Sequence, residues 1–184
     1  MKKLLILLLI SLFFEMPTSS QNLELINPSK NIGLKNWSIV NDDVMGGVSK
    51  SNILINEENN LVFKGYLSLK NNGGFASSRM DIIKKDLNGV KFFEIKLKGD
   101  GNNYKLRFRQ DNTRASYSCD FKSQKNEWII VKLAIENFEA TWRGYTYSDY
   151  PALNLNKINS LSLHISDKQE GEFNLEVEYI KAIK

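Results

Sequence analysis

Alternation of apolar and polar residues with a period of two is the feature that most constrains the fold of this chain. In residues 92–98 the apolar side chains Phe93, Ile95 and Leu97 are separated by charged ones, and residues 104–109 repeat the pattern. Successive side chains of a strand point to opposite faces of a sheet, so each segment has one apolar and one polar face. The sequence shows no heptads, no long helical period and no repeat of solenoid length. The pattern therefore predicts a protein built from β-strands.

The predicted strands are short and are separated by turn sequences. They cover residues 48–55, 61–69, 75–81, 92–98, 104–109, 115–121, 129–135, 161–165 and 173–179. The polar cluster 56–60 joins the first two strands, and the turn sequence 99–103 predicts a hairpin between residues 92–98 and 104–109. Many half-buried strands with regular turn signals indicate an all-β fold, an antiparallel two-sheet β-sandwich of the jelly-roll kind.

Three segments depart from the alternation. Residues 22–36 lack periodicity and predict a lead-in with at most one short strand, while residues 82–89 form the only stretch that suits a helical turn. Residues 136–157 are rich in aromatic side chains and predict a long crossing rather than a strand. Within residues 61–69, Gly65 stands where a side chain is missing, which indicates a bulge or a close backbone approach.

The N-terminus has the features of an export signal. Lys2 and Lys3 precede an apolar run that ends before Pro17, and small residues follow. We predict a signal peptide over residues 1–20 and a single β-sandwich domain over residues 21–184. The run is shorter than the ~20 residues of a spanning helix, so the cleaved protein is expected to be periplasmic or secreted, not an integral membrane protein.

Composition limits the classes of partner and the source of stability. The chain has 184 residues and a formal net charge of +4, which is mild and evenly spread and argues against binding to nucleic acid. Cys119 is the single cysteine, so no internal disulfide can form. It alternates with Tyr117 and Phe121, which predicts a buried small hydrophobe. Stability is therefore expected to come from apolar packing.

Two segments with paired glycines are candidate binding loops. In residues 41–51 and in residues 71–79, polar side chains precede a Gly-Gly pair and a strand-like run follows. A glycine pair accepts positive φ and lets another group approach the main chain. The candidate binding residues, which include three from elsewhere in the chain, are Asn41, Asp42, Asp43, Met45, Gly46, Gly47, Asn72, Gly73, Gly74, Arg79, Asp100, Trp142 and Arg143.

Opposite charges accompany these loops. Asp42 and Asp43 lie in the first segment and Arg79 ends the second, so neighbouring strands would bring them into one patch. A simpler interpretation is that the glycines are turn residues, that Asn41 and Asp42 form Asx turns and that Arg79 is a surface cation. Both interpretations remain open from sequence.

The sequence offers few groups suited to catalysis. His164 is the only histidine and is expected to point outward from its strand. Asp42 or Asp43 paired with Asp100 or Asp167 would suit general acid–base chemistry or Ca²⁺ binding. A zinc site of histidine ligands is excluded, and neither a nucleophile elbow nor a phosphate-binding glycine loop is present. We predict no enzyme activity, no metal and no cofactor.

Aromatic side chains form the second candidate recognition surface. Trp142, Tyr145, Tyr147 and Tyr150 lie in one connection together with Arg143. Such side chains stack on sugar rings or anchor a protein partner, because they combine a large area with a polar tip. The other interpretation is that Trp142 closes the end of the core.

The chain resembles a known family along nearly its whole length after the leader. The matching features are Trp37, residues 41–49, Phe63 with Gly65, residues 71–79, residues 98–101 with Tyr104, Trp128, Phe138, Arg143 with Gly144, and residues 167–173. This pattern resembles the complex I intermediate-associated protein 30 family. The resemblance implies a galactose-binding-domain-like β-sandwich and a role in assembling the respiratory NADH:ubiquinone oxidoreductase.

Three functions follow from these observations. The leading hypothesis is a non-catalytic protein-binding module that resembles complex I assembly factors or chaperones, with a protein client such as a respiratory-complex subunit. The first alternative is a periplasmic carbohydrate-binding module that uses the aromatic connection and the acidic loop. The second is a weak hydrolase that uses a carboxylate pair.

Overall fold

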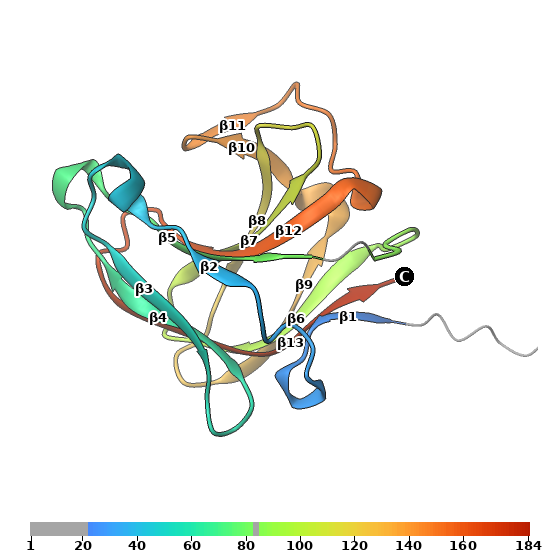
Figure 1. Cartoon of the computed structure of the whole chain (residues 1–184), viewed down its shortest axis with the longest axis horizontal. Coiled ribbons are helices and arrows are strands. Elements are labelled where there is room, and N and C mark those ends of the chain that lie inside the picture. Colours follow the sequence, from blue (N-terminus) through green and yellow to red (C-terminus); the bar gives the residue numbers. More distant parts are fainter. Residues whose placement is uncertain (1–21, 83–84) are drawn as a thin grey trace, which may run out of the picture.

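Two antiparallel sheets packed face to face form the structure, a computed structural model that describes residues 22–82 and 85–184 (Figure 1). The predicted all-β sandwich of the jelly-roll kind is confirmed. The predicted signal peptide of residues 1–20 lies outside the described residues. Within those residues, we find no helix with the length and apolar character needed to cross a membrane.

The smaller sheet has six strands in the order β3-β4-β13-β6-β9, with β1 also paired to β13. Its strands are β1 (Leu23–Ile26), β3 (Lys50–Ile55), β4 (Leu61–Leu67), β6 (Phe92–Lys98), β9 (Trp128–Ala134) and β13 (Gly171–Ile183). The long β13 pairs with β4, β6 and β1, so it holds this sheet together.

The larger sheet has seven strands in the order β11-β10-β8-β7-β12-β5-β2. Its strands are β2 (Trp37–Ile39), β5 (Ala76–Asp81), β7 (Asn103–Gln110), β8 (Ser116–Lys122), β10 (Glu139–Trp142), β11 (Tyr145–Tyr147) and β12 (Ile158–Ile165). Short 3-10 turns connect the strands: η1 (Pro28–Lys30), η2 (Asp42–Met45), η3 (Lys70–Asn72), η4 (Ile135–Asn137) and η5 (Leu155–Lys157).

The core lies between the sheets and follows the predicted alternation. Phe93 of β6 packs on Phe108 of β7 across the sandwich, with ring centroids 4.6 Å apart. Phe138 joins both rings. Cys119 is 7% exposed and faces the same core, and burial raises the pKa of its thiol to about 11. Full burial of a Phe, Leu, Ile or Val side chain stabilises a fold by about 1.5–3 kcal/mol, and the core contains many such side chains.

The predicted hairpin of residues 92–98 and 104–109 is wrong. β6 pairs with β13 and β9, whereas β7 pairs with β8 and β12 in the other sheet. The intervening turn therefore carries the chain from one sheet to the other. The apolar faces of both strands are satisfied by packing against each other across the core, so no backbone pairing between them is needed.

The prediction of a strandless crossing over residues 136–157 is also wrong. β10 and β11 form a hairpin in which Trp142 pairs with Tyr145. The loop residues Arg143 and Gly144 have φ of +52° and +81°. A two-residue loop of type I′ requires positive φ at both positions. Asparagine, aspartate and glycine are the usual residues there, so the Arg-Gly pair concealed the hairpin.

Two smaller predictions can be assigned. The lead-in contains the one short strand that was expected, β1. A side chain at Gly65 would collide with the carbonyl oxygen of Lys50 on β3, so the glycine marks a close backbone approach. The expected helical turn over residues 82–89 is not observed in its described part, where Asn88 and Gly89 form a simple turn; residues 83–84 lie outside the described residues.

Candidate functional site

The two glycine-containing loops lie side by side at one end of the sandwich. The first follows β2 and contains η2, and the second precedes β5 and contains η3. A buried carboxylate in the first loop bonds backbone amides of the second. We call the exposed region formed by residues 41–49 and 69–75 the glycine-loop surface. It contains the candidate residues of both segments except Arg79, which lies on β5.

Asp42 fixes this arrangement. Its side chain has no exposed area, and its Oδ1 accepts the Ser49 backbone amide at 2.9 Å. Its Oδ2 accepts the Ser49 hydroxyl and the backbone amides of Gly74 at 2.7 Å and Phe75 at 3.3 Å. Burial alone would raise the pKa of this carboxyl, but these hydrogen bonds outweigh burial and leave the pKa below its usual value. The carboxylate is therefore ionised and joins the loops.

The two glycines of each pair have different roles around Asp42. Gly46 and Gly74 adopt φ of +92° and +130°, which favour glycine. Gly47 and Gly73 lie against the carboxylate: a Cβ on Gly47 would overlap Asp42, and one on Gly73 would lie 2.6 Å from Oδ2. One glycine of each pair thus turns the chain, and the other admits the carboxylate.

The remaining residues of the surface are either anchors or exposed. Asn41 is 7% exposed, and its Oδ1 accepts the Ser51 hydroxyl at 2.7 Å and the Ser77 amide at 3.3 Å. Met45 is 59% exposed. Asp43 and Asn72 are exposed as well. Buried polar residues therefore hold a segment whose other side chains face solvent.

The predicted charge pairing of Asp42 or Asp43 with Arg79 is wrong. Asp42 is occupied by backbone and hydroxyl donors. Arg79 instead lies on the outer face of the larger sheet, where burial and the Arg109 cation lower its pKa and Asp81 opposes them. Strand alternation sets which face of β5 carries Arg79, and this constraint outweighs the attraction of a distant acid.

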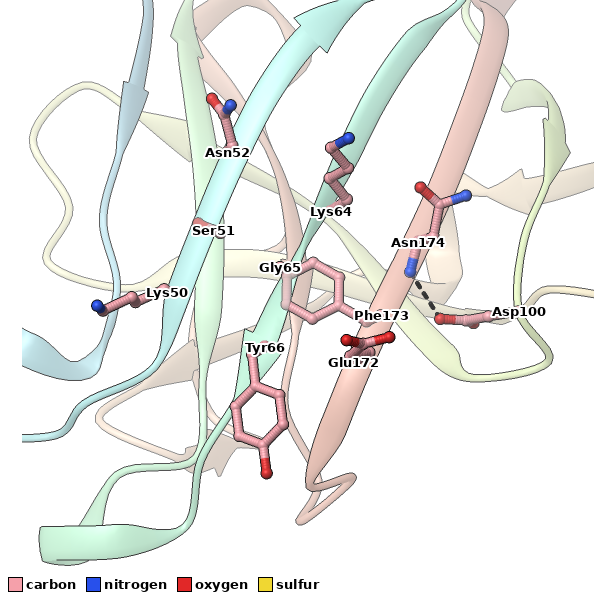
Figure 2. Close-up of a pocket in the computed structure, with 10 residues that line it drawn as sticks. All are labelled: Lys50, Ser51, Asn52, Lys64, Gly65, Tyr66, Asp100, Glu172, Phe173 and Asn174. Carbon is pink, nitrogen blue, oxygen red and sulfur yellow. Dashed lines mark hydrogen bonds between the residues drawn. The ribbon is translucent and has the colours of Figure 1, made fainter.

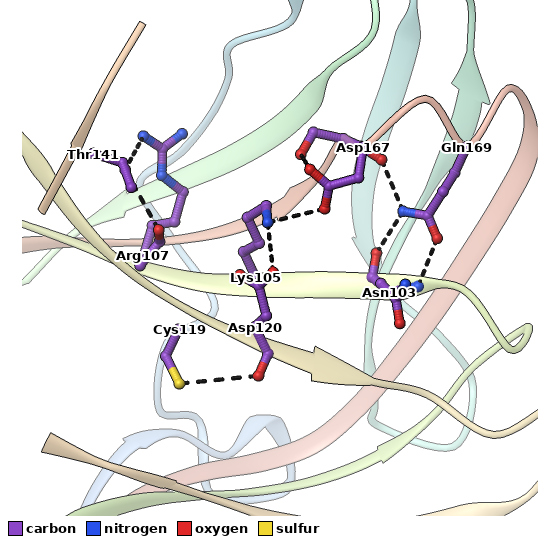
Figure 3. Close-up of polar contacts among 10 residues, drawn as sticks. Asn103, Lys105, Arg107, Cys119, Asp120, Thr141, Asp167 and Gln169 are labelled. Carbon is purple, nitrogen blue, oxygen red and sulfur yellow. Dashed lines mark hydrogen bonds and ion pairs between the residues drawn. The ribbon is translucent and has the colours of Figure 1, made fainter. Parts of the chain in front are cut away.

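The predicted carboxylate pairs do not form either. Asp100 accepts the Tyr104 hydroxyl at 2.9 Å and the Asn174 amide at 2.8 Å and lines an open cavity of about 690 Å³ beside the smaller sheet (Figure 2). Burial and this carboxylate raise the pKa of Tyr104. Asp167 binds Lys105 at 2.9 Å (Figure 3). Among the described residues, no group of three potential His, Cys, Asp or Glu ligands gathers to hold a metal ion.

His164 points outward from its strand, as expected, but it is buried there, with 7% of its surface exposed. It lies on the outer face of β12, but its ring stacks on Phe75 at 5.5 Å, and its Nδ1 is 3.3 Å from Nη1 of Arg107. Burial, and then the cations Arg107 and Lys105, hold its pKa well below the usual value. The neutral ring therefore accepts a hydrogen bond from Arg107. Alternation identifies the polar face of a strand but not what covers that face.

Trp142 and Arg143 lie away from the glycine-loop surface. Their hairpin forms one edge of the larger sheet, whereas β2, which leads into the first loop, forms the other. Trp142 is 37% exposed with the Arg143 guanidinium 4.9 Å from its ring. The alternative in which Trp142 closes the core is wrong, because Trp142 is exposed and the nearby residues that are buried in the core are Phe138 and Ala140.

Replacement of Asp42 by asparagine should destabilise the fold by about 3 kcal/mol, because the amide places a donor against backbone donors that the carboxylate accepted. Urea denaturation measures this change. Asp43→Asn is the matched control, since Asp43 is exposed, and it should change stability by less than about 0.5 kcal/mol. Equal effects of the two substitutions would contradict the assigned role of Asp42.

Protonation of His164 should make the fold less stable in mild acid. Its pKa is lowered by folding, so below about pH 6.5 the unfolded state binds a proton that the native state does not. The free energy of unfolding should therefore fall from pH 7 to pH 5, by up to about 1.4 kcal/mol per pH unit. His164→Gln should remove most of this slope in urea titrations. Retention of the full slope would show that another group titrates.

Comparisons with known proteins agree with this architecture. The family model described as complex I intermediate-associated protein 30 (CIA30) matches residues 26–177. The protein named "Probable complex I intermediate-associated protein 30, mitochondrial" from Caenorhabditis elegans is 26% identical over 167 residues, covering 78% of this chain and 49% of the relative. The chain thus spans about half the length of the curated relative that it matches.

Solved structures of carbohydrate-binding modules share the fold. The family 11 module of the cellulosomal cellulase Lic26A-Cel5E of Clostridium thermocellum superposes with a TM-score of 0.67 at 11% identity, covering 91% of this chain and 97% of that one. A family 11 module from the same organism, in complex with a mixed-linked tetrasaccharide, gives 0.64 at 13%, covering 90% and 97%. Such low identities show the fold alone. By its family-model match, the chain belongs to the complex I intermediate-associated protein 30 family.

Proposed function

We propose that this protein is a non-catalytic protein-binding module that acts in the manner of an assembly factor and docks a protein client on the glycine-loop surface. One observation carries the proposal. Val44, Met45 and Val48 are 72%, 59% and 46% exposed on a segment that Asp42 and Asn41 hold in place. Large apolar side chains that project from a fixed loop are characteristic of binding surfaces.

Rigidity makes this surface suited to binding. The Asp42 carboxylate accepts hydrogen bonds from Ser49 in the first loop and from Gly74 in the second. The loop therefore has little conformational entropy to lose when it binds a client. Leu69, 37% exposed, extends the apolar region onto the second loop. A client with a complementary apolar recess would bury these side chains together.

Family membership supports a protein client. The family and the nematode relative are both named for association with a complex I intermediate. We therefore propose subunits or assembly intermediates of the respiratory NADH:ubiquinone oxidoreductase as the client class. In keeping with this role, Asp42 and Asp100 are engaged in separate structural hydrogen bonds rather than poised as an acid–base pair.

Met45→Asp and Val44→Asp should each reduce client binding at least about tenfold, because a charge would be buried at the centre of the contact. The tagged full chain is used to isolate respiratory subunits from detergent-solubilised membranes, with quantification by mass spectrometry. Ile130→Asp is the matched control, since Ile130 is 54% exposed on β9, at the opposite edge of the smaller sheet from β3. Undiminished capture by the loop variants would refute the docking surface.

Carbohydrate binding is the second candidate, favoured by the β10–β11 hairpin. Tyr145 and Tyr147 are 72% and 40% exposed, and Trp142 lies beside them with its ring partly open. Exposed aromatic rings on one hairpin provide stacking surfaces for sugars. The fold shared with carbohydrate-binding modules is compatible with this use.

If the hairpin binds glycans, Trp142→Ala and Tyr145→Ala should abolish saturable binding on a glycan array and in titration calorimetry. The loss follows from removal of the stacking surface. Tyr66→Ala serves as the control, because Tyr66 is a 49% exposed aromatic residue on the smaller sheet. Absence of saturable glycan binding by the unaltered protein would eliminate this candidate and leave the glycine-loop surface untouched.

A further inference from the structure

The outer face of the larger sheet carries three arginines around two serines. The register of β5, β12 and β7 places Ser162 between Arg79 and Arg107 in one cross-strand row. In the next row, Ser160 is the direct partner of Arg109. Asp81 lies on the other side of Ser160. Directly opposed residues in a sheet have Cβ atoms ~5 Å apart, so these side chains are close neighbours on one face.

Among the described residues these arginines form no ion pair, although the Asp81 carboxylate partly offsets the charge of Arg79. The ion pairs identified within residues 22–82 and 85–184 are all formed by lysines. The hydrogen-bond partners of Arg107 are neutral: His164 at 3.3 Å, and Thr141 at 3.5 Å, which Figure 3 shows. The Nε of Arg79 is buried and has no hydrogen-bond partner in the described structure. Buried donors of this kind are rare in native proteins unless a bound group satisfies them.

The cations also repel one another. Burial, and then the neighbouring Arg79 and Arg109, lower the pKa of Arg107 to about 10. Arginine side chains are always charged in proteins, so the face concentrates positive charge in a partly desolvated place. Lys105 on the same strand differs, because it is paired with Asp120 at 2.7 Å and Asp167 at 2.9 Å (Figure 3). On this strand Lys105 is thus ion-paired, whereas Arg107 and Arg109 form no ion pair among the described residues.

An open cavity of about 610 Å³ gives a ligand access to this charge. Arg79, Arg109 and Ser160 line one side of it, and Thr113 and Asn159 add polar groups. The carboxylates Asp81 and Asp111 line the same cavity, and Asp111 accepts the Asn159 amide at 2.8 Å. Guanidinium donors beside carboxylate acceptors fit a ligand that bears both an oxyanion and hydroxyl groups.

We propose that this face is an oxyanion site, in which Arg79 and Arg109, the arginines that line the cavity, bind the phosphate or sulfate group of a ligand above Ser160, while the neighbouring Arg107 adds positive charge from outside the lining. Arginine is suited to this role because its planar fork donates two parallel hydrogen bonds to such a group. His164 is a positioning residue, since its neutral ring accepts a hydrogen bond from Arg107 and directs that side chain. The site is separate from the glycine-loop surface and does not depend on the docking proposal.

The test is titration calorimetry of the purified protein with inorganic phosphate, inorganic sulfate, glucose 6-phosphate, glucose 6-sulfate and glucose, at an ionic strength held constant with sodium chloride. Saturable binding is expected for at least one oxyanion and not for glucose. Arg79→Gln and Arg109→Gln should each weaken it about tenfold or more, because each removes a charge-assisted contact. A sugar ester that binds tighter than the free ion identifies the source as a substituted sugar; equal affinities identify the free ion.

Arg114→Gln is the matched control, because Arg114 is exposed in the turn between β7 and β8 and does not line the cavity. This variant should bind oxyanions like the unaltered protein. Melting temperatures without oxyanion separate ligand binding from a structural role. Removal of Arg79 or Arg109 should leave the melting temperature unchanged or raise it, since a like-charge repulsion is relieved. The proposal is overturned if no oxyanion binds saturably, or if both arginine variants bind as tightly as the Arg114 control.

Discussion

One buried carboxylate determines the shape of the end of the molecule to which we assign function. Asp42 accepts hydrogen bonds from Ser49 in its own loop and from Gly74 and Phe75 in the other. An ionised group without solvent contact is tolerated only where several donors surround it, so both loops must keep their conformations together. The glycines beside it, the placement of Phe75 and the outward direction of Met45 all follow from that requirement.

The strands could be predicted from sequence, but their partners could not. Alternation identifies the inward side chains of β6 and β7 correctly because it reports burial directly. It does not report pairing: the glycine-rich turn after Lys98 suits a hairpin and also suits a change of sheet. The choice depends on β13, which is distant in sequence and takes the position beside β6.

The candidate site shows the same division. Paired glycines with preceding polar residues identified the loops, because close approach and positive φ impose those residue types locally. The surroundings of Arg79 and the burial of His164 were missed, since both depend on how the larger sheet brings β5, β12 and β7 together. A signal was present in the alternation of Ser160, Ser162 and His164 beside the basic strand β7. Short neutral side chains between long cations leave room for a ligand.

The position of β13 in the chain has a consequence for biosynthesis. This strand follows every other strand in sequence, yet it lies in the interior of the smaller sheet, between β4 and β6, and also pairs with β1. Until the ribosome has released it, β4 and β6 lack their shared neighbour, and their apolar faces have an incomplete layer to pack against. Closure of the smaller sheet is therefore expected to be a late step of folding that waits for β13, although the other described strands are made before it.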